Sequence, residues 1–413
     1  MSTAQPLIFN PLDPGFRVDP YPIYRRLLEE QPVHLTPFGV PAFARYDDCF
    51  AILRDHKRFS SDETKSPDYV LQHQAIEAQA ESLGADFNEG DRPFLFLDPP
   101  DHSRLRRLVN QAFTPRAVEG LRPRIQQIVD ALLDKAASTD SMDVVAELAY
   151  PLPVIVICEM LGVPAEDQAT FRVWSSELAR SLDPEITQPP DVLERRVRAI
   201  SESREYFRGL VAEHRAAPRP DILSALIAAE EEGDKLGEGE LLSTCTLLLI
   251  AGHETTVNLI ANGLLQLLRH PQELARFTSE PGLAPSVVEE VLRFDPPVQF
   301  DGRIALEEME FGGLKLTRGQ FVMLLLGAAN RDSSHFADPN RFDITRNDDR
   351  HLAFGYGIHF CLGAPLARLE GQIALRTLVE RFRALELATD PPPYKESITL
   401  RGPSALPISF RAA

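Results

Sequence analysis

One cysteine of the chain, Cys361, stands where a thiolate could be presented to a metal. It lies in FGYGIHFCLG, residues 354–363, directly before a run of helical periodicity that begins at about Leu362. A cysteine at a helix start faces unpaired backbone N–H groups and the positive end of the helix dipole, which favour its thiolate. Glycines before and after it, Gly355 and Gly363, let the backbone approach a flat ligand closely. These features make Cys361 a candidate ligand for haem iron.

Other interpretations of this loop were weighed. An unpaired cysteine is often only a small buried side chain. The glycines at 355 and 357 lack a third glycine at Phe360, so the loop is not a dinucleotide-binding fingerprint. His359 is a second candidate for the iron. It cannot share the axial position with Cys361 two residues away, and the helix start favours the thiolate.

A second chemically distinctive stretch interrupts a long apolar segment, Leu241 to Leu268. As a helix this segment would be about 42 Å long, and because it is apolar nearly all round we expect it to be buried. The run AGHETT lies in its middle. Thr255 follows Ala251 by four residues, so its hydroxyl is expected to reach back to that carbonyl and distort the helix. With Glu254 beside it, the sequence predicts a polar notch in an apolar wall.

An ion pair is predicted in SVVEEVLRF, residues 286–294. Glu290 and Arg293 are three residues apart and therefore share one helix face. The surrounding valine, leucine and phenylalanine residues leave little exposed face. A desolvated pair needs further hydrogen-bond partners, so we interpret it as a structural lock rather than as part of a catalytic site.

Four basic side chains could bind the carboxylates of a cofactor. His102 and Arg106 are four residues apart, on one helical face. Arg303 stands at the head of a predicted strand, and His359 belongs to the cysteine loop. Haem carries two propionates, which require cationic or hydrogen-bonding partners. Taken singly, each of these residues is no more than a base on an acidic protein.

The elements that must position these residues are mostly helical, and the fold class is mainly α with a minor β region. Strands are expected at roughly 33–46, 303–327 and 384–411. Composition does not shift enough anywhere to divide the chain, so we expect a single domain over residues 1–413. Apolar recurrence at helical spacing predicts helices over Tyr21–Glu30, Arg104–Phe113, Leu121–Ala136, Val192–Glu213 and Leu366–Phe382.

Composition excludes several classes of function. The 413 residues include 43 basic and 61 acidic side chains, a net charge of −18, so we expect no nucleic-acid partner. The four cysteines contain no CxxC pair and predict neither a disulfide framework nor a zinc knuckle. We find no signal peptide and no apolar run approaching the ~20 residues of a membrane helix. We therefore expect a soluble, cytoplasmic monomer without a membrane anchor.

The cysteine loop resembles the haem-binding loop of the cytochrome P-450 monooxygenases, whose pattern F-G-x-G-x-H-x-C-x-G is complete in residues 354–363. AGHETT is similar to the oxygen-activation motif of that family, and Glu290-x-x-Arg293 to its E-x-x-R motif. The resemblance extends over essentially the whole chain and is nearest to the soluble bacterial branch. It implies the cytochrome P-450 fold, with haem b between the long central helix and the helix that follows Cys361.

The resemblance also implies roles for residues at the haem. Thr255 would stabilise the oxygen bound at the iron, Glu254 would feed protons to it, and Ala251 would leave room for dioxygen. Arg341 or Asn340 would be the third partner of the E-x-x-R pair. Cys361 would be the iron ligand, and the other haem contacts would be His102, Arg106, Arg303, His359, Phe354, Gly355 and Gly363.

The implied substrate wall is apolar, with Gln299 as a polar group that could orient the substrate. It is expected in the 75–96 region, near Leu248 and Ala251, at residues 298–300 and at the turn near Ile398. Its apolar side chains would be Phe94, Phe96, Leu248, Val298 and Phe300.

The implied reaction is hydroxylation: one atom of O2 enters a C–H bond of a lipophilic small molecule and the other is reduced to water. Nothing in the chain resembles a flavin or nicotinamide domain, so a separate ferredoxin and ferredoxin reductase would supply electrons. Arg104 and Arg107 are predicted to belong to a positive face that docks the acidic carrier. Two alternatives stay open, a peroxide-driven peroxygenase on the same fold and a non-catalytic haem protein that senses a ligand.

Overall fold

Helices form most of the structure. The computed structural model describes residues 7–83, 92–183, 190–231, 234–348 and 350–412. The helices are α1 (Pro14–Val18), α2 (Tyr21–Glu30), α3 (Tyr46–Arg54), α4 (Pro67–Leu83), α5 (Asp101–Ala112), α6 (Pro115–Gly120), α7 (Arg122–Ala136), α8 (Pro151–Met160), α9 (Gln168–Ala179), α10 (Pro190–Ala216), α11 (Ile222–Ala228), α12 (Glu238–Arg269), α13 (Pro271–Ser279), α14 (Ala284–Phe294), α15 (Leu326–Ala329) and α16 (Ala364–Arg381).

The strands are short and form small sheets. The larger sheet has the order β1-β2-β10-β7-β3, with β2 and β10 parallel and the other neighbours antiparallel. A second sheet has the order β11-β12-β4, and β5-β6 and β8-β9 are separate pairs. The strands are β1 (Val33–Leu35), β2 (Pro41–Phe43), β3 (Phe59–Ser60), β4 (Ser141–Asp143), β5 (Glu230–Glu231), β6 (Asp234–Lys235), β7 (Asp301–Ala305), β8 (Met309–Phe311), β9 (Leu314–Leu316), β10 (Phe321–Leu324), β11 (Phe382–Leu387) and β12 (Pro407–Ala412).

The helices predicted from periodicity are confirmed, with shifts of a few residues at their ends. α2 has the predicted bounds, and α10 and α12 extend beyond theirs at both ends. Each predicted strand segment contains strands, although residues 388–406, inside the third segment, lie between β11 and β12. The acidic stretch 75–91 is helical in α4 up to Leu83, and its remainder lies outside the described residues.

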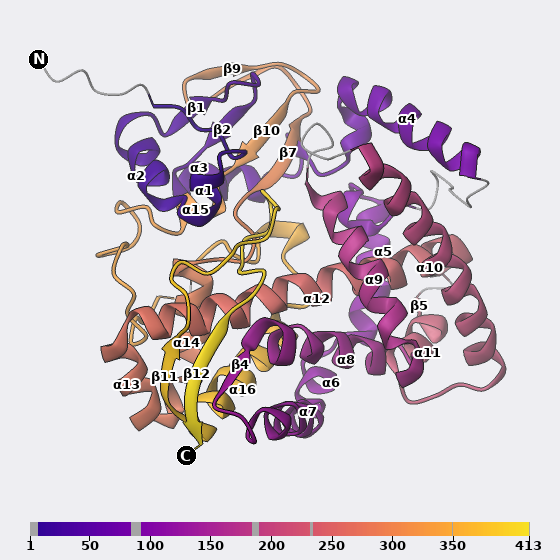
Figure 1. The fold of residues 1–413 in the computed structure, drawn as a ribbon. Coiled ribbons are helices and arrows are strands. Elements are labelled where there is room, and N and C mark those ends of the chain that lie inside the picture. The colour runs from indigo at the N-terminus through magenta and orange to yellow at the C-terminus, as the bar shows by residue number, and fades with distance from the viewer. Residues whose placement is uncertain (1–6, 84–91, 184–189, 232–233, 349, 413) are drawn as a thin grey trace, which may run out of the picture.

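Helix α12 organises the molecule around itself. It begins at Gly237, whose backbone N–H donates to Glu240 Oε2 (2.8 Å), and it ends before Pro271, which starts α13. Its apolar side chains are buried on several sides, against α8 and α9 on one part and α14 and α16 on another. Figure 1 shows α12 crossing the centre, with the β1–β2–β10–β7 sheet above it and α16 below. Residues of α12 therefore contact helices from both the N-terminal and the C-terminal half of the chain.

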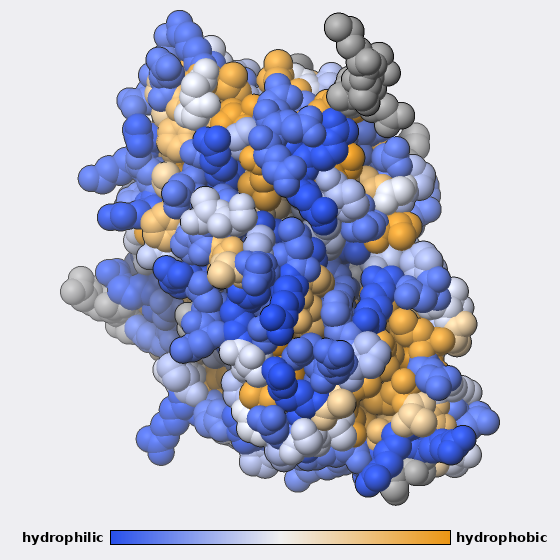
Figure 2. Space-filling model, turned by 90° about the vertical axis from the view of Figure 1, so that its left-hand side faces the viewer, coloured by the Kyte–Doolittle hydropathy of each residue, from blue (hydrophilic) through white to orange (hydrophobic). Residues whose placement is uncertain are grey.

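The outside of the molecule is mainly hydrophilic. On the face shown in Figure 2 blue side chains predominate, and apolar residues gather in separate patches. This matches the net charge of −18. None of the described helices combines the length and hydropathy that crossing a membrane requires.

Candidate functional site

The cysteine loop is held by its own backbone. Cys361 N–H donates to the Phe354 carbonyl (3.0 Å), which closes the loop upon itself. Gly355 and Gly357 have φ values of 67° and 74°, in the region that favours glycine. At Gly357 a Cβ atom would also lie only 2.6 Å from the Leu53 carbonyl oxygen, so α3 and the loop pack too closely for any side chain there.

The structure corrects the prediction that a helix start directly after Cys361 makes it a thiolate. The helix after it, α16, begins at Ala364 rather than at about Leu362. Burial raises the pKa of Cys361, although backbone N–H groups of Gly363 and Ala364 and the charge of Arg106 oppose the shift. The helix start alone therefore does not make Cys361 a thiolate. A bound metal ion would supply the missing positive charge, because metal binding releases the thiol proton.

A residue that the sequence analysis missed, Arg368, braces the loop from α16. Its guanidinium lies 4.6 Å from the centre of the Phe354 ring. Its Nε and Nη2 donate to the Glu289 carboxylate (2.6 and 2.9 Å), which also pairs with His351 Nε2 (3.1 Å). Burial would raise the pKa of Glu289, but these hydrogen bonds hold it at about 2. The only sequence signal for Arg368 was its spacing from Cys361, about two helical turns further along the chain.

The predicted basic residues come together beside the cysteine loop. The rings of His102 and His359 lie 4.1 Å apart, and Arg106 Nη2 donates to the Phe360 carbonyl (2.7 Å). Buried Arg303, on β7, donates to Asp301 Oδ1 (2.8 Å) and to the Gly302 carbonyl (2.6 Å). Residues from α5, β7 and the loop thus meet at one place.

This basic cluster has buried nitrogen atoms without partners. Both ring nitrogens of His102 and Nε2 of His359 form no hydrogen bond with any described residue. Burial lowers the pKa of His102 to about 4, and burial together with His102, Arg303 and Arg106 lowers that of His359 to about 2. Buried polar atoms normally have partners. The unpaired nitrogens beside two guanidinium groups therefore fit an anionic group.

The hydrogen bond predicted in the notch of α12 forms, but α12 continues as helix across the notch, so the predicted distortion of the helix is not seen. Thr255 Oγ1 donates to the Ala251 carbonyl (2.9 Å), and Thr256 Oγ1 donates to the Gly252 carbonyl (3.3 Å). Thr255 is partly exposed and Ala251 is exposed, although the residues on both sides of the notch are mostly buried. A hydroxyl on an accessible helix face inside an apolar wall can hold a small polar ligand or a proton donor.

The acid of the notch, Glu254, forms an ion pair that the sequence did not predict. Its Oε2 lies 2.5 Å from Lys395 Nζ, and its side chain is 8% exposed. Burial raises its pKa, but Lys395 and His253 more than offset this, so the pKa of Glu254 lies below its usual value. His253, to which the sequence analysis gave no role, is buried and lies 2.5 Å through Nδ1 from Ser175 Oγ.

The pair Glu290–Arg293 is fully buried, as predicted, with Nε and Nη2 donating to the carboxylate (2.7 and 2.8 Å). Arg341 is a further partner of the pair, as expected, through its carbonyl, which accepts from Arg293 Nη2 (3.2 Å); the carbonyls of Asn330 and Pro339 also accept from Arg293. A side chain that was not predicted, Arg346, joins the pair, and its Nε donates to Glu290 Oε2 (3.2 Å).

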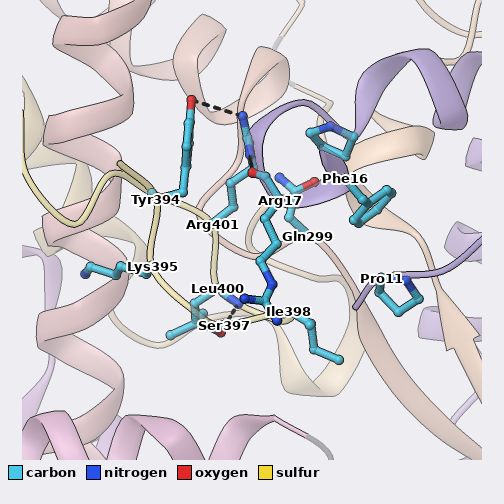
Figure 3. A pocket seen from close by; sticks show the side chains of 12 residues that line it. Pro11, Phe16, Arg17, Gln299, Tyr394, Lys395, Ser397, Ile398, Leu400 and Arg401 are labelled. Carbon is cyan, nitrogen blue, oxygen red and sulfur yellow. Dashed lines mark hydrogen bonds between the residues drawn. The ribbon is translucent and has the colours of Figure 1, made fainter. Parts of the chain in front are cut away.

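The predicted substrate residues belong to different apolar clusters. Phe94 and Leu248 belong to one apolar cluster, and Phe96 is partly buried nearby in the chain. Phe300 packs instead with the N-terminal helices, and Val298 pairs with Leu400 through an isolated β-bridge. Gln299 donates to the Pro296 carbonyl (2.8 Å) and lines a pocket with Phe16, Arg17, Tyr394 and others (Figure 3).

The two arginines predicted to dock a redox partner also differ. Arg104 is partly exposed and pairs with Asp234 (3.3 Å) and Glu240, so two carboxylates of the same chain offset its charge. Its place on the docking face stays a prediction. Arg107 is exposed.

Comparison with known proteins identifies this arrangement. The Cytochrome P450 family model matches residues 45–281 and 282–408. Cytochrome P450 CYP107DY1 of Priestia megaterium is 44% identical, covering 94% of this chain and 95% of the relative. The 6-deoxyerythronolide B hydroxylase of Saccharopolyspora erythraea is 41% identical, covering 95% and 96%. The ligand-free crystal structure of Mycobacterium smegmatis CYP164A2 matches with a TM-score of 0.87 and 45% identity, covering 98% and 100%.

The fold and the site thus define a haem-thiolate enzyme. The chain belongs to the cytochrome P450 family, as the resemblance of its motifs implied, and it is a monooxygenase that uses haem b. Its residues fit this cofactor. Cys361 lies on a closed loop, and Ala251 is exposed while Gly355 and Gly363 are partly exposed. The basic cluster has buried nitrogens without partners among the described residues.

Proposed function

We propose that this monooxygenase hydroxylates a lipophilic small molecule, inserting one atom of O2 into a C–H bond and reducing the other atom to water. The observation that carries the proposal is the pairing of an acid and a threonine in the notch of α12. The Thr255 hydroxyl is held by the Ala251 carbonyl, and Glu254 directly precedes Thr255 in the helix. A peroxide-driven or ligand-sensing protein has no need of this pair.

The residues around the cofactor take the following roles in this proposal. Haem b supplies the iron that binds and activates dioxygen. Cys361 ligates that iron, and the buried nitrogens of His102 and His359, with the guanidinium groups of Arg106 and Arg303, hold the propionates. Phe354, Gly355 and Gly363 line the cysteine side, where Arg368 holds the Phe354 ring in place.

Proton supply falls to the notch. The Thr255 hydroxyl would hold and pass on a proton beside the cofactor, and Ala251 would leave space next to it. Glu254 replenishes these protons from the protein side. Glu290 and Arg293 take no part in this chemistry and hold the segment before the cysteine loop in place.

The substrate is proposed to be apolar and to contact Phe94 and Leu248, which share one cluster. Phe96, Val298 and Phe300 remain proposed wall residues, although Phe300 packs toward the N-terminal helices. One similar protein is named as a hydroxylase of 6-deoxyerythronolide B. This supports hydroxylation of a compound of comparable apolar character.

Electrons are proposed to come from a ferredoxin and its reductase as separate proteins. Tyr356 and Phe360, which both precede Cys361 in the cysteine loop, are exposed large apolar residues, and Arg107 on α5 is exposed. Such a surface, apolar at the centre with a cationic residue, suits an acidic electron carrier. The four cysteines are free thiols, which supports the proposed reducing, cytoplasmic location.

The test is product formation with a matched screen of electron sources. A panel of fatty acids, terpenoids, steroids and polyketides is first screened for compounds that shift the haem spin state. Hits are then incubated with ferredoxin, reductase and 18O2. We expect a hydroxylated product carrying one 18O atom. Equal or faster product formation with peroxide would favour a peroxygenase, and the absence of any spectral shift would favour a sensor.

A further inference from the structure

A buried polar stripe runs along the apolar helix α12. Its members are spaced by four residues and therefore lie on one face of the helix. All of them are buried: Glu254, Asn258, Asn262 and Gln266. Their partners come from Asp295 and from the segment 394–402 near the C-terminal strand. A stripe of this kind in a leucine-rich helix stabilises the fold only where its hydrogen bonds are complete.

The lower half of the stripe is mostly paired, although the buried Oδ1 of Asn262 has no partner among the described residues. Asn262 Nδ2 donates to the carbonyls of Asp295 and Arg401 (3.1 Å each), and Gln266 Nε2 donates to Asp295 Oδ2 (2.9 Å). Asp295 also accepts from Tyr21 and from Arg401 Nε (2.6 and 2.8 Å). These contacts join both ends of the chain to α12, which is a structural function.

The upper half is incomplete. Asn258 is fully buried, and neither its Oδ1 nor its Nδ2 forms a hydrogen bond with a described residue. It lies against Gly402, where an added Cβ would be 2.3 Å from Asn258 Oδ1. The backbone N–H of Lys395 donates to the Gly402 carbonyl (3.1 Å), so the same short segment carries both the neighbour of Asn258 and the partner of Glu254.

Lys395 connects this upper half with solvent. Its Nζ lies 2.5 Å from Glu254 Oε2, yet 21% of its side chain is exposed against 8% for Glu254. Lys395, Ser397 and Gly402 line the pocket of Figure 3, where the Lys395 side chain points away from Phe16 and Pro11. The lysine thus reaches from an accessible pocket to the acid of the notch.

The other groups near Glu254 do not provide such a connection. His253 Nε2 lies 3.9 Å from Glu254 Oε1, and burial lowers the pKa of His253 to about 4, so it is neutral at pH 7. The Tyr150 hydroxyl donates to the Arg172 carbonyl (3.2 Å), and burial raises its pKa well above the usual value. The Arg172 guanidinium covers the Tyr150 ring (4.4 Å). Among the described residues, Lys395 is the cation that pairs with Glu254.

We propose that Lys395 relays protons from water in this pocket to Glu254, and so supplies the acid–threonine pair from the side of the 394–402 segment. This proposal rests on the proposed function of Glu254 and Thr255. A proton passes from Lys395 Nζ to Glu254 Oε2, converting the ion pair into a neutral amine and a neutral acid. Glu254 releases its proton toward Thr255 and becomes a carboxylate again. The amine regains a proton from solvent.

The chemistry of the pair suits this exchange. Burial favours the neutral pair, whereas the charge of Lys395 holds the pKa of Glu254 below its usual value, so the ion pair is the resting state and the neutral pair forms only transiently. Lysine can give up its proton when desolvated, whereas arginine stays protonated in proteins. Replacing Lys395 with arginine therefore distinguishes a proton relay from a fixed positive charge.

The experiment compares Lys395→Met and Lys395→Arg with the wild type in the reconstituted ferredoxin system, in H2O and D2O. If Lys395 relays protons, both variants lower the substrate-dependent turnover rate by about tenfold or more and enlarge the solvent isotope effect, with KM unchanged. Lys315→Met, which alters an exposed lysine on the β8–β9 pair, is the matched control and should retain the wild-type rate.

Each other outcome has a defined meaning. Wild-type turnover and isotope effect in Lys395→Arg would overturn the relay, because a fixed positive charge would then suffice. Wild-type turnover in Lys395→Met would overturn it as well. Glu254→Gln separates the two proposals: if it leaves turnover unchanged, the acid role itself is wrong, whereas slow Glu254→Gln with fast Lys395 variants contradicts only the relay.

A second measurement does not depend on turnover. Infrared difference spectra of the resting holoprotein between acidic and neutral pH report protonated carboxyl groups. Without the Lys395 charge, the effect of burial should raise the pKa of Glu254. Lys395→Met should therefore gain a carboxyl band that the double variant Lys395→Met/Glu254→Gln lacks. Identical spectra of these two variants would contradict the coupling on which the relay depends.

Discussion

Two buried carboxylates, Glu290 on α14 and Glu370 on α16, have opposite surroundings. Glu290 accepts from Arg293, from Arg346 and from the backbone N–H of Asp343 (2.9 Å). Glu370 is buried without a hydrogen bond to either oxygen from any described residue. Burial raises its pKa to about 8, with only the nearby Thr256 hydroxyl opposing.

The difference separates structural from chemical polar groups. On α14 both side chains of the Glu290–Arg293 pair have hydrogen-bond partners, so the pair resists change and contributes to folding. In the basic cluster, ring nitrogens of His102 and His359 lack partners among the described residues. We interpret these unpaired nitrogens as contacts for the propionates of the cofactor.

The largest effect is expected at the fully paired Glu290–Arg293 ion pair. Arg293→Ala leaves the Glu290 charge buried and three carbonyls without their donor. We expect a loss of at least about 5 kcal/mol of unfolding free energy, enough to prevent recovery of haem-loaded protein. Urea unfolding of any folded fraction measures it. Arg341→Ala is the control, since Arg341 contributes only its carbonyl to the pair, and near-equal stabilities of the two variants would refute the lock.

The unpaired carboxyl group of Glu370 should make the unfolding free energy of the protein depend on pH. The pKa of Glu370 is about 8 when folded and near 4.5 when unfolded, so its penalty is absent below pH 4.5 and complete above pH 8. As pH rises through this window, wild type should lose about 2–4 kcal/mol relative to Glu370→Gln. Parallel pH–stability curves of the two holoproteins would show that Glu370 is not neutral in the fold.

At the notch the effect is kinetic. Thr255→Ala should bind substrate normally but lower the product formed per electron pair by about tenfold, with the electrons recovered as peroxide. Thr278→Ala removes the same kind of intrahelical bond, to the Leu274 carbonyl (2.9 Å), on the surface of α13. It should keep full coupling. Tight coupling in Thr255→Ala would contradict the role given to this hydroxyl.

The smallest effect is expected at a solvated pair. Arg104 is partly exposed and pairs with Asp234 and Glu240, so Arg104→Ala should cost under about 1 kcal/mol. It should also leave the rate of reduction by ferredoxin unchanged. Arg107→Glu should slow that reduction. Equal effects of the two variants, measured by stopped flow, would remove Arg107 from the proposed docking face.

Local patterns in the sequence predicted the helices and the contacts between residues that are close together in the chain. The length of α12, the bond from Thr255 to Ala251 and the burial of the Glu290–Arg293 pair all follow from spacings of three or four residues. The cysteine loop is contiguous, so its pattern was also readable.

Partners distant in the chain were not predictable in this way. Lys395 meets Glu254 across 141 residues, and Arg346 meets Glu290 across 56. No periodicity connects such positions, because loops outside regular elements bring them together. The state of the Cys361 thiol also depends on burial by distant residues, which is why the prediction from its place before a helix was incomplete.

The ligation of haem by Cys361 is tested most directly by the spectrum of the reduced protein with carbon monoxide. A thiolate ligand should give the strongly red-shifted haem band, and Cys361→Ser should abolish it. Cys158→Ser, which alters a buried cysteine in α8, should retain it. Persistence of the red-shifted band in Cys361→Ser would contradict the assignment of Cys361 as the iron ligand.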